Sequence, residues 1–414
     1  MNELFGPLSV EARNLVQSVP ALIDRTFPLP GRFRAGLAAD VAELSRLMTA
    51  DRGERELSYL SRPNHLSAYL RYFFPWNIFR LCRLLPNLNI DLSPGDVILD
   101  LGCGPLSLAA ALWISRPDLR IPLEFRCIDR TAAVLEAGKK FFAALTGSGC
   151  PWKITTIKAS VNPMGTIKLN SGKKNRPPLK GKPGGDKARA NPVKEKSAAL
   201  VCAINVFNEI YRKISPADRG GVQKAAARTA GLLDSCAAES ASILVVEPGV
   251  PFSGAFISCL RDALIEKKRF PGSPCPHFHV CPFPGGEGSA GKKRWCHFAF
   301  DTEEAPAALR RLSAAAGIPK DRAVLSFLYT DNNRRKQPAS GGGEAVRIIS
   351  DAFPLPDGTF GRYGCSSQGL VLVAGKRAAI EACFSGMSLN IPVDKNNERD
   401  RKSGALLVQI HQSG

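Results

Sequence analysis

Two groups of residues have types and spacings that could do chemistry. The first is Asp100-Leu-Gly-Cys-Gly104, which follows an apolar run and precedes a helical pattern. Gly102 and Gly104 let the backbone approach a bound ligand closely, because no side chain is there to collide with it. Asp129 ends the next apolar run, where a carboxylate can accept both hydroxyls of a ribose. The group predicts a nucleoside pocket; an ordinary strand-to-helix turn is the alternative.

The second group is rich in thiols. Of the twelve cysteines, Cys275, Cys281 and Cys296 stand in the spacing C-x5-C-x14-C, and Cys365 is a candidate for a fourth ligand. Four thiolates suit zinc or a cubic iron–sulfur cluster. The nearby His277, His279 and His297 could complete a zinc site instead, although the paired C-x2-C spacing of zinc fingers is absent. The remaining alternative is a loop with buried free thiols.

Alternating strands and helices must position the nucleoside pocket. Apolar strand patterns cover 97–101, 123–129, 153–160, 198–204 and 242–248, and helical patterns lie between them and over 252–270. Such alternation predicts an α/β fold with a parallel sheet. The fourth strand ends at Asn205, Asn208 and Glu209 and the fifth at Glu247, at the edge where open parallel sheets bind ligands. Asn205 and Asn208 either contact the ligand or cap a helix.

The arrangement is similar to that of class I methyltransferases, which bind S-adenosylmethionine (SAM). It differs from the dinucleotide fingerprint, which has a third glycine for a pyrophosphate. Leu106 stands where many methyltransferases have a further glycine. No catalytic base or nucleophile is evident, so the catalytic residues are unknown. The residues assigned to the cofactor are Asp100, Gly102, Gly104, Asp129, Asn205 and Glu247.

Several short sequences resemble those of the Rsm-type, methyltransferase-like family of mitochondrial and bacterial ribosomal small-subunit assembly factors. They are RYFFPWNIFRL, EPGVPFSGAFISCLRDAL, SPCPHFHVCP and WCHF. The resemblance covers about residues 55–380. It implies a SAM-type Rossmann domain, binding to small-subunit rRNA, and a [4Fe-4S] cluster. By position, Cys275, Cys281 and Cys296 match the first three cluster ligands of the family, and Cys365 matches the fourth.

The charge of the chain fits a nucleic-acid partner. Lys plus Arg number 56 and Asp plus Glu 37, a net charge of +19, which predicts an anionic partner. Ten Lys or Arg crowd into the Pro- and Gly-rich stretch 168–196, within the predicted flexible insertion 167–196. This stretch is either a solubilising insertion or an arm that orders on RNA. The alternative RNA-binding surface is the charge near the cysteines, at Lys292, Lys293 and Arg294, where Trp295 and Phe298 could stack on bases or pack in the core. No apolar run is long enough to span a membrane. With no targeting segment at its start, the sequence predicts a cytoplasmic protein, a monomer and no membrane partner.

Four regions are predicted. They are a helical region (1–90), the SAM-methyltransferase-like domain (91–260), a metal-bound, β-rich module (261–383) and a polar tail (384–414). In the helical region, Arg71, Arg80 and Arg83 either pack internally or bind phosphate. The predicted function is a small-subunit assembly or translation factor that binds rRNA and a [4Fe-4S] cluster. The alternatives are an active SAM-dependent rRNA methyltransferase and a zinc-binding RNA protein.

Overall fold

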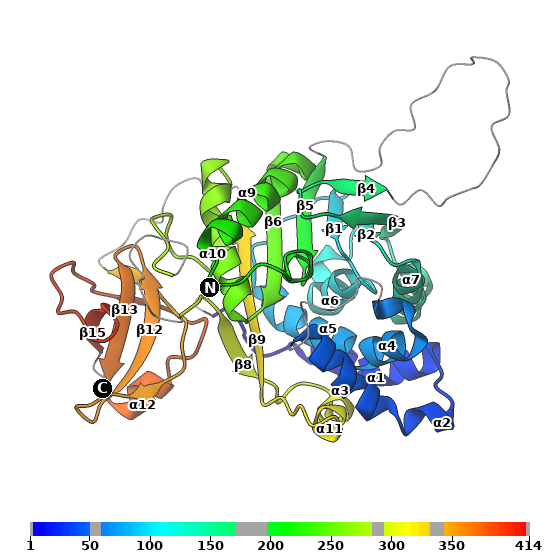
Figure 1. Ribbon diagram of the computed structural model, residues 1–414, viewed down its shortest axis with the longest axis horizontal. Coiled ribbons are helices and arrows are strands. Elements are labelled where there is room, and N and C mark those ends of the chain that lie inside the picture. Colours follow the sequence, from blue (N-terminus) through cyan, green and yellow to red (C-terminus); the bar gives the residue numbers. More distant parts are fainter. Residues whose placement is uncertain (1–2, 50–58, 170–196, 284–293, 332–342, 411–414) are drawn as a thin grey trace, which may run out of the picture.

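The N-terminal region is a helical cap. The structure, a computed structural model, describes residues 3–49, 59–169, 197–283, 294–331 and 343–410. The first helix begins at Ser9, whose side chain accepts a hydrogen bond from Ala12 N, and its buried residues recur every three or four positions. The cap contains α1 (Val10–Thr26), α2 (Gly31–Arg34), α3 (Leu37–Met48), α4 (Pro63–Ala68), the π-helical turn η2 (Tyr69–Phe73) and α5 (Phe74–Leu84), drawn in blue in Figure 1.

The arginines of the cap pack internally. Arg71 is buried and pairs with Asp24, and the buried Arg83 pairs with Asp301. Arg80 donates to the Val324 carbonyl and to the Asn77 side chain. Because these guanidinium groups already have acceptors within the protein, the structure favours the packing alternative over a phosphate-binding role.

The central sheet has the class I methyltransferase strand order, which confirms that part of the predicted fold. Its order is β4-β3-β2-β1-β5-β6-β9-β7, with β8 also paired to β9. The five neighbouring strands β3-β2-β1-β5-β6 run parallel to one another, and β9 runs antiparallel to β6. The strands are β1 (Val97–Leu101), β2 (Glu124–Asp129), β3 (Lys153–Val161), β4 (Ile167–Leu169), β5 (Ala198–Ile204), β6 (Ala237–Pro248), β7 (Pro271–Ser273), β8 (Phe298–Asp301) and β9 (Arg322–Thr330).

Helices cover both faces of this sheet (Figure 1). Neighbouring residues on one strand belong to different cores: Ile98 packs with the cap helices, and Leu99 with α9 and α10. Burial on both faces explains why the parallel strands are almost continuously apolar. No helix of the described ranges is long and apolar enough to cross a membrane. The covering helices are α6 (Ser107–Ser115), α7 (Ala132–Thr146), α8 (Phe207–Ile210), α9 (Arg219–Cys236) and α10 (Pro251–Glu266), and α11 (Ala307–Ala315) packs on the cap.

A second sheet forms the C-terminal module, to the left in Figure 1. Its order is β14-β10-β12-β13-β15, with β11 beside β12. The structure divides the chain differently from the predicted boundaries, because β7 to β9 continue the first sheet beyond residue 260. The expected polar tail supplies β14 and β15, since Leu406 and Val408 are buried. The elements are β10 (Glu344–Ile348), β11 (Phe353–Pro354), β12 (Phe360–Ser366), β13 (Gly369–Gly375), α12 (Arg377–Glu381), β14 (Ser388–Ile391) and β15 (Leu406–Ile410).

Candidate functional site

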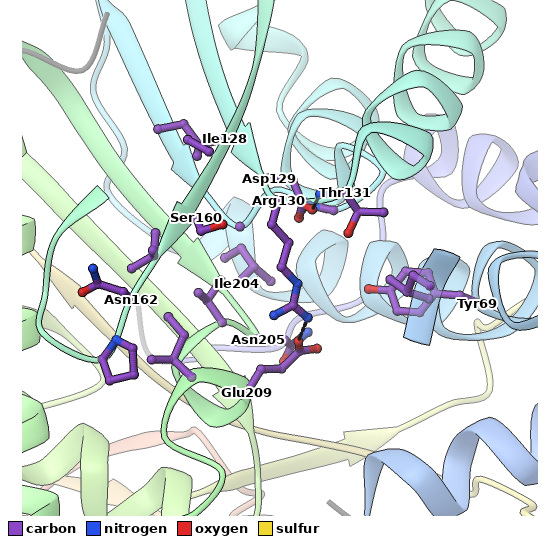
Figure 2. A pocket seen from close by; sticks show the side chains of 18 residues that line it. Tyr69, Ile128, Asp129, Arg130, Thr131, Ser160, Asn162, Ile204, Asn205 and Glu209 are labelled. Carbon is purple, nitrogen blue, oxygen red and sulfur yellow. Dashed lines mark hydrogen bonds and ion pairs between the residues drawn. The ribbon is translucent and has the colours of Figure 1, made fainter. Parts of the chain in front are cut away.

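A cavity of about 240 Å³ opens where the carboxyl ends of the parallel strands meet. Four of the six residues assigned to the cofactor line it: Gly102, Gly104, Asp129 and Asn205. They come from the ends of β1, β2 and β5, and Figure 2 shows Asp129 and Asn205 facing the same space. The structure therefore brings these four residues together at the edge where open α/β sheets bind ligands.

The glycine turn keeps its shape despite the missing third glycine. Gly102 has a φ of 68°, and a Cβ there would lie 2.5 Å from Val206 Cγ2. Leu106 also adopts the left-handed conformation, with a φ of 62°. This costs a non-glycine residue about 1–2 kcal/mol. The Leu106 side chain is fully buried, which contributes about 1.5–3 kcal/mol and offsets the strain.

Asp129 is held in place by the backbone. Its Oδ2 accepts from Gly104 N at 3.1 Å, and its Oδ1 accepts from Thr131 N at 2.8 Å. Burial raises the pKa of the Asp129 carboxyl, and these two hydrogen bonds oppose that shift. Since each carboxylate oxygen has two lone pairs, the side chain can still accept hydroxyl groups from a ligand.

Asp100 lies beneath the cavity and does not line it. Its side chain is 1% exposed, and Oδ1 has no hydrogen-bond partner among the described residues. Burial, with a contribution from the nearby Asp129, raises the pKa of Asp100 to about 8. In the sheet register Asp100 stands between Cys127 on β2 and Cys202 on β5. The surroundings therefore favour a protonated carboxyl at neutral pH.

Glu247 also lies behind the cavity wall. Its fully buried carboxylate accepts from the backbone nitrogens of Val206, Phe207 and Asn208 at 2.8–3.1 Å. It thereby fixes the chain between β5 and α8, so it positions the wall of the cavity. Its assignment to the cofactor stays a prediction. Asn208 lies within α8 and does not line the cavity.

Asn205 needs an unusual backbone conformation. Its φ is 58°, a left-handed value that asparagine tolerates better than most residues. Its Nδ2 donates to Asn77 Oδ1 at 3.2 Å, which ties the cavity to the helical cap. It precedes Val206, the N-cap of α8, so its side chain does not cap that helix.

Glu209 lines the cavity as the sequence predicts, whereas sequence reasoning missed Arg130 and Tyr69. Arg130 pairs with Glu209 at 3.1 Å, and Figure 2 shows this pair reaching from the end of β2 to α8. Tyr69 comes from the π-helical turn, and its hydroxyl lies 3.8 Å from the Cβ position of Gly104. Because Arg130 directly follows Asp129 at the end of β2, its position in the sequence could have indicated that it lines the cavity. No sequence pattern marks Tyr69, although π-turns are frequent at functional sites.

The four predicted cysteine ligands come from distant segments and influence one another electrostatically. Burial, followed by the neighbouring Cys275, raises the pKa of Cys281 to about 11. The pKa of Cys365, on β12, is raised by burial and by the other three thiols; Cys275 and Cys281 act in the same way on Cys296.

The histidines around these thiols have different surroundings. His277 is buried, and its Nε2 lies 3.2 Å from Cys365 Sγ. His297 Nδ1 lies 3.0 Å from the Trp295 carbonyl, and His279 is exposed. Of the three, His277 therefore is the one in hydrogen-bond contact with a predicted thiol ligand among the described residues.

The thiol donor set fits a metal or an iron–sulfur cluster in its chemistry. As arranged, however, no group of three or more His, Cys, Asp or Glu in the described ranges could hold a metal ion. The metal site therefore stays a prediction. A second feature supports the fit: Arg261, a buried cation, lies close enough to Cys275 and Cys281 to interact with both thiols electrostatically.

Part of the predicted RNA-binding surface lies outside the described residues, namely 170–196 together with Lys292 and Lys293. Arg294 stacks over the ring of Tyr363 at 4.9 Å. Trp295 is half-buried and donates to the Gly249 carbonyl, and Phe298 is fully buried against Phe327. Phe298 therefore packs in the core and does not present its ring to a base.

Comparisons with known proteins give a set of solved structures and one family match. Similar solved structures include a geranyl diphosphate methyltransferase with GPP and sinefungin, 11% identical with a TM-score of 0.32, covering 72% of this chain and 99% of that one. Another is the Haloferax volcanii methyltransferase complex with the Trm112 activator, 9% identical with a TM-score of 0.29, covering 70% and 96%. No curated protein matches the chain. A family model described as mitochondrial small ribosomal subunit Rsm22 matches residues 223–352, the range that holds Cys275, Cys281 and Cys296, and it confirms the Rsm-type family resemblance there.

Proposed function

We propose that the protein is an assembly or translation factor of the small ribosomal subunit, built on a methyltransferase fold. The observation that carries the proposal is the family match over 223–352, because this range includes α10 and three of the four predicted thiol ligands. In this role the protein binds small-subunit rRNA and acts as a monomer.

Its nucleoside pocket would hold SAM, which supplies an activated methyl group when bound. Asp129 would accept the ribose hydroxyls, and the bare backbone at Gly102 and Gly104 would leave room for the rest of the ligand. Asn205, fixed by Asn77, would orient the ligand from the opposite wall. Glu247 would act indirectly, because it holds the loop on which Asn205 stands.

The metal-bound module would hold a [4Fe-4S] cluster on Cys275, Cys281, Cys296 and Cys365. Three of these residues belong to the segment between β7 and β8 of the first sheet, and Cys365 belongs to β12 of the second sheet. A metal bound there would join the two modules, and its binding energy would add to their stability. Iron, sulfide and zinc assays on anaerobically purified protein distinguish this proposal from a zinc-binding RNA protein.

The rRNA contact rests on charge. A chain of +19 would bind rRNA with a salt dependence that reports the number of phosphate contacts. The test is filter binding to small-subunit rRNA and to an unrelated RNA of equal length over a range of salt concentrations. Equal affinity for both RNAs, or affinity that is insensitive to salt, would argue against a ribosomal partner.

An active SAM-dependent rRNA methyltransferase is the second candidate. The open cavity at the strand ends favours it. Against it, the two carboxylates that line the cavity already have partners: Asp129 accepts two backbone N–H groups, and Glu209 pairs with Arg130. Transfer of labelled methyl groups from SAM to assembling small subunits would establish the enzyme.

A further inference from the structure

Two buried arginines hold the loop that carries Cys275 and Cys281. From α10, Arg261 Nη2 donates to the carbonyls of His277 at 2.9 Å and His279 at 2.7 Å. From β10, Arg347 Nε donates to the Pro274 carbonyl at 3.1 Å. The loop has no regular secondary structure after Ser273, so these bonds replace the partners that a strand or helix would provide. Arg261 belongs to α10, which packs on the first sheet, and Arg347 belongs to β10 of the second sheet.

One N–H donor of Arg261 has no acceptor among the described residues. Its side chain is 2% exposed, and Nη1 donates to Asp262 at 2.6 Å. Its Nε is buried and has no hydrogen-bond partner among the described residues. A buried donor without an acceptor costs about 1–3 kcal/mol, so such a group usually has a purpose beyond packing.

The face of α10 that carries Arg261 is directed at the thiols. Ser258, one turn earlier, has its Oγ 3.6 Å from Cys281 Sγ. The charge of Arg261 lowers the pKa of Cys281, Cys296 and Cys365, in opposition to the larger effect of burial. By its hydrogen bonds, this face of α10 therefore contacts the loop that carries Cys275 and Cys281.

We propose that Arg261 is the positioning residue and counter-ion of the four-cysteine site. The inference rests on the proposed metal site and adds to it a residue that binds no metal. Four thiolates around zinc or an oxidised [4Fe-4S] core leave a net negative charge of about two, and a buried anion needs a cation beside it. Arg261 supplies that charge and, through two carbonyls, holds the loop on which two of the ligands stand.

The test compares full-length wild type with Arg261→Gln and Arg261→Lys, all purified anaerobically. Iron, sulfide and zinc per chain, the rate of metal loss to a chelator, and the reduction potential are measured. We expect Arg261→Gln to lose metal at least about tenfold faster, the range seen when groups that support metal ligands are removed. Any cluster it retains should have a more negative potential. Arg261→Lys keeps the charge but lacks the planar guanidinium that donates to two carbonyls at once. It should stay near the wild-type reduction potential and lose metal at an intermediate rate.

Arg269→Gln is the matched control. Arg269 is also buried and donates to Asp234 and to the Glu239 carbonyl, away from the cysteine loop. The inference is overturned if Arg261→Gln matches wild type in metal content, loss rate and potential, or if Arg269→Gln loses metal equally fast. A wild-type chain without metal would overturn the metal proposal and this inference together. A failure confined to the Arg261 variants leaves the metal proposal intact.

Discussion

The buried carboxyl of Asp100 should make the stability of the protein depend on pH. The side chain is 1% exposed, Oδ1 has no partner among the described residues, and burial raises the pKa of Asp100 to about 8. In the unfolded chain an aspartate has a pKa of about 3.9. Between these two values the folded protein holds a proton that the unfolded chain has released.

The direction of the effect follows from this difference. The stabilisation is fully present below the unfolded pKa, and it is lost as pH rises towards 8. The free energy of unfolding should therefore fall by up to about 1.4 kcal/mol per pH unit in this window. Asp100→Asn keeps the shape and removes the titration. Relative to wild type it should gain at most about 1.5 kcal/mol at pH 5 and about 4 kcal/mol at pH 7.

Urea unfolding of the ligand-free protein at pH 5, 6, 7 and 8 measures this difference. Asp118→Asn is the control, because pairing with Arg116 lowers the pKa of Asp118 and places its titration below this range. Its effect on stability should be the same at all four pH values. If Asp100→Asn and wild type give parallel curves from pH 5 to 8, Asp100 is ionised in the folded protein and the reasoning is refuted.

Four other changes test the two sites and the RNA contact. Asp129→Ala should weaken SAM binding about 10- to 100-fold by calorimetry, because hydrogen bonds to a charged group contribute about 1.5–3 kcal/mol each; a wild type that binds no SAM would refute the nucleoside pocket. Gly102→Ala should abolish binding and lower the Tm, because its Cβ would lie 2.5 Å from Val206 Cγ2. Cys281→Ser should lose metal in iron, sulfide and zinc assays, whereas Cys236→Ser, at a buried thiol on α9, should keep it. Deleting 168–196 removes ten cations and should reduce both rRNA affinity and its salt slope; an unchanged slope would leave the segment as a solubilising insertion.

The sequence predicts the central sheet well because its signal is local. The inner parallel strands β1 and β5 are buried on both faces and are followed by helical patterns, so the order of elements can be read along the chain. The Gly102 and Gly104 turn and Asp129 could be found for the same reason, since each stands next to the strand that positions it. The cysteine segment was found from its density of thiols and from short family sequences.

Features that depend on contacts between distant segments were not predicted. The strand β15 is short and lies in a polar region, and it forms because β13 offers a parallel partner. The ion pair between Arg130 and Glu209 joins the end of β2 to α8, which only the folded sheet brings together. The positioning role of Glu247 requires its strand to lie beside the β5–α8 turn, which the sequence alone does not specify.

The unit formed by β6 and α10 connects the two candidate sites physically. At the end of β6, Glu247 holds the turn that forms one wall of the nucleoside cavity. On α10, which follows directly, Ser258 and Arg261 contact the cysteine segment. A rigid helix that begins at one site and passes the other fixes the distance between them. A protein that only binds rRNA would still need this unit, because the same helix holds the cysteine segment against the sheet. The cavity could therefore persist as part of the scaffold even if no methyl group is transferred. An intact pocket alone is then weak evidence for catalysis. Methyl transfer to assembling subunits is the decisive measurement.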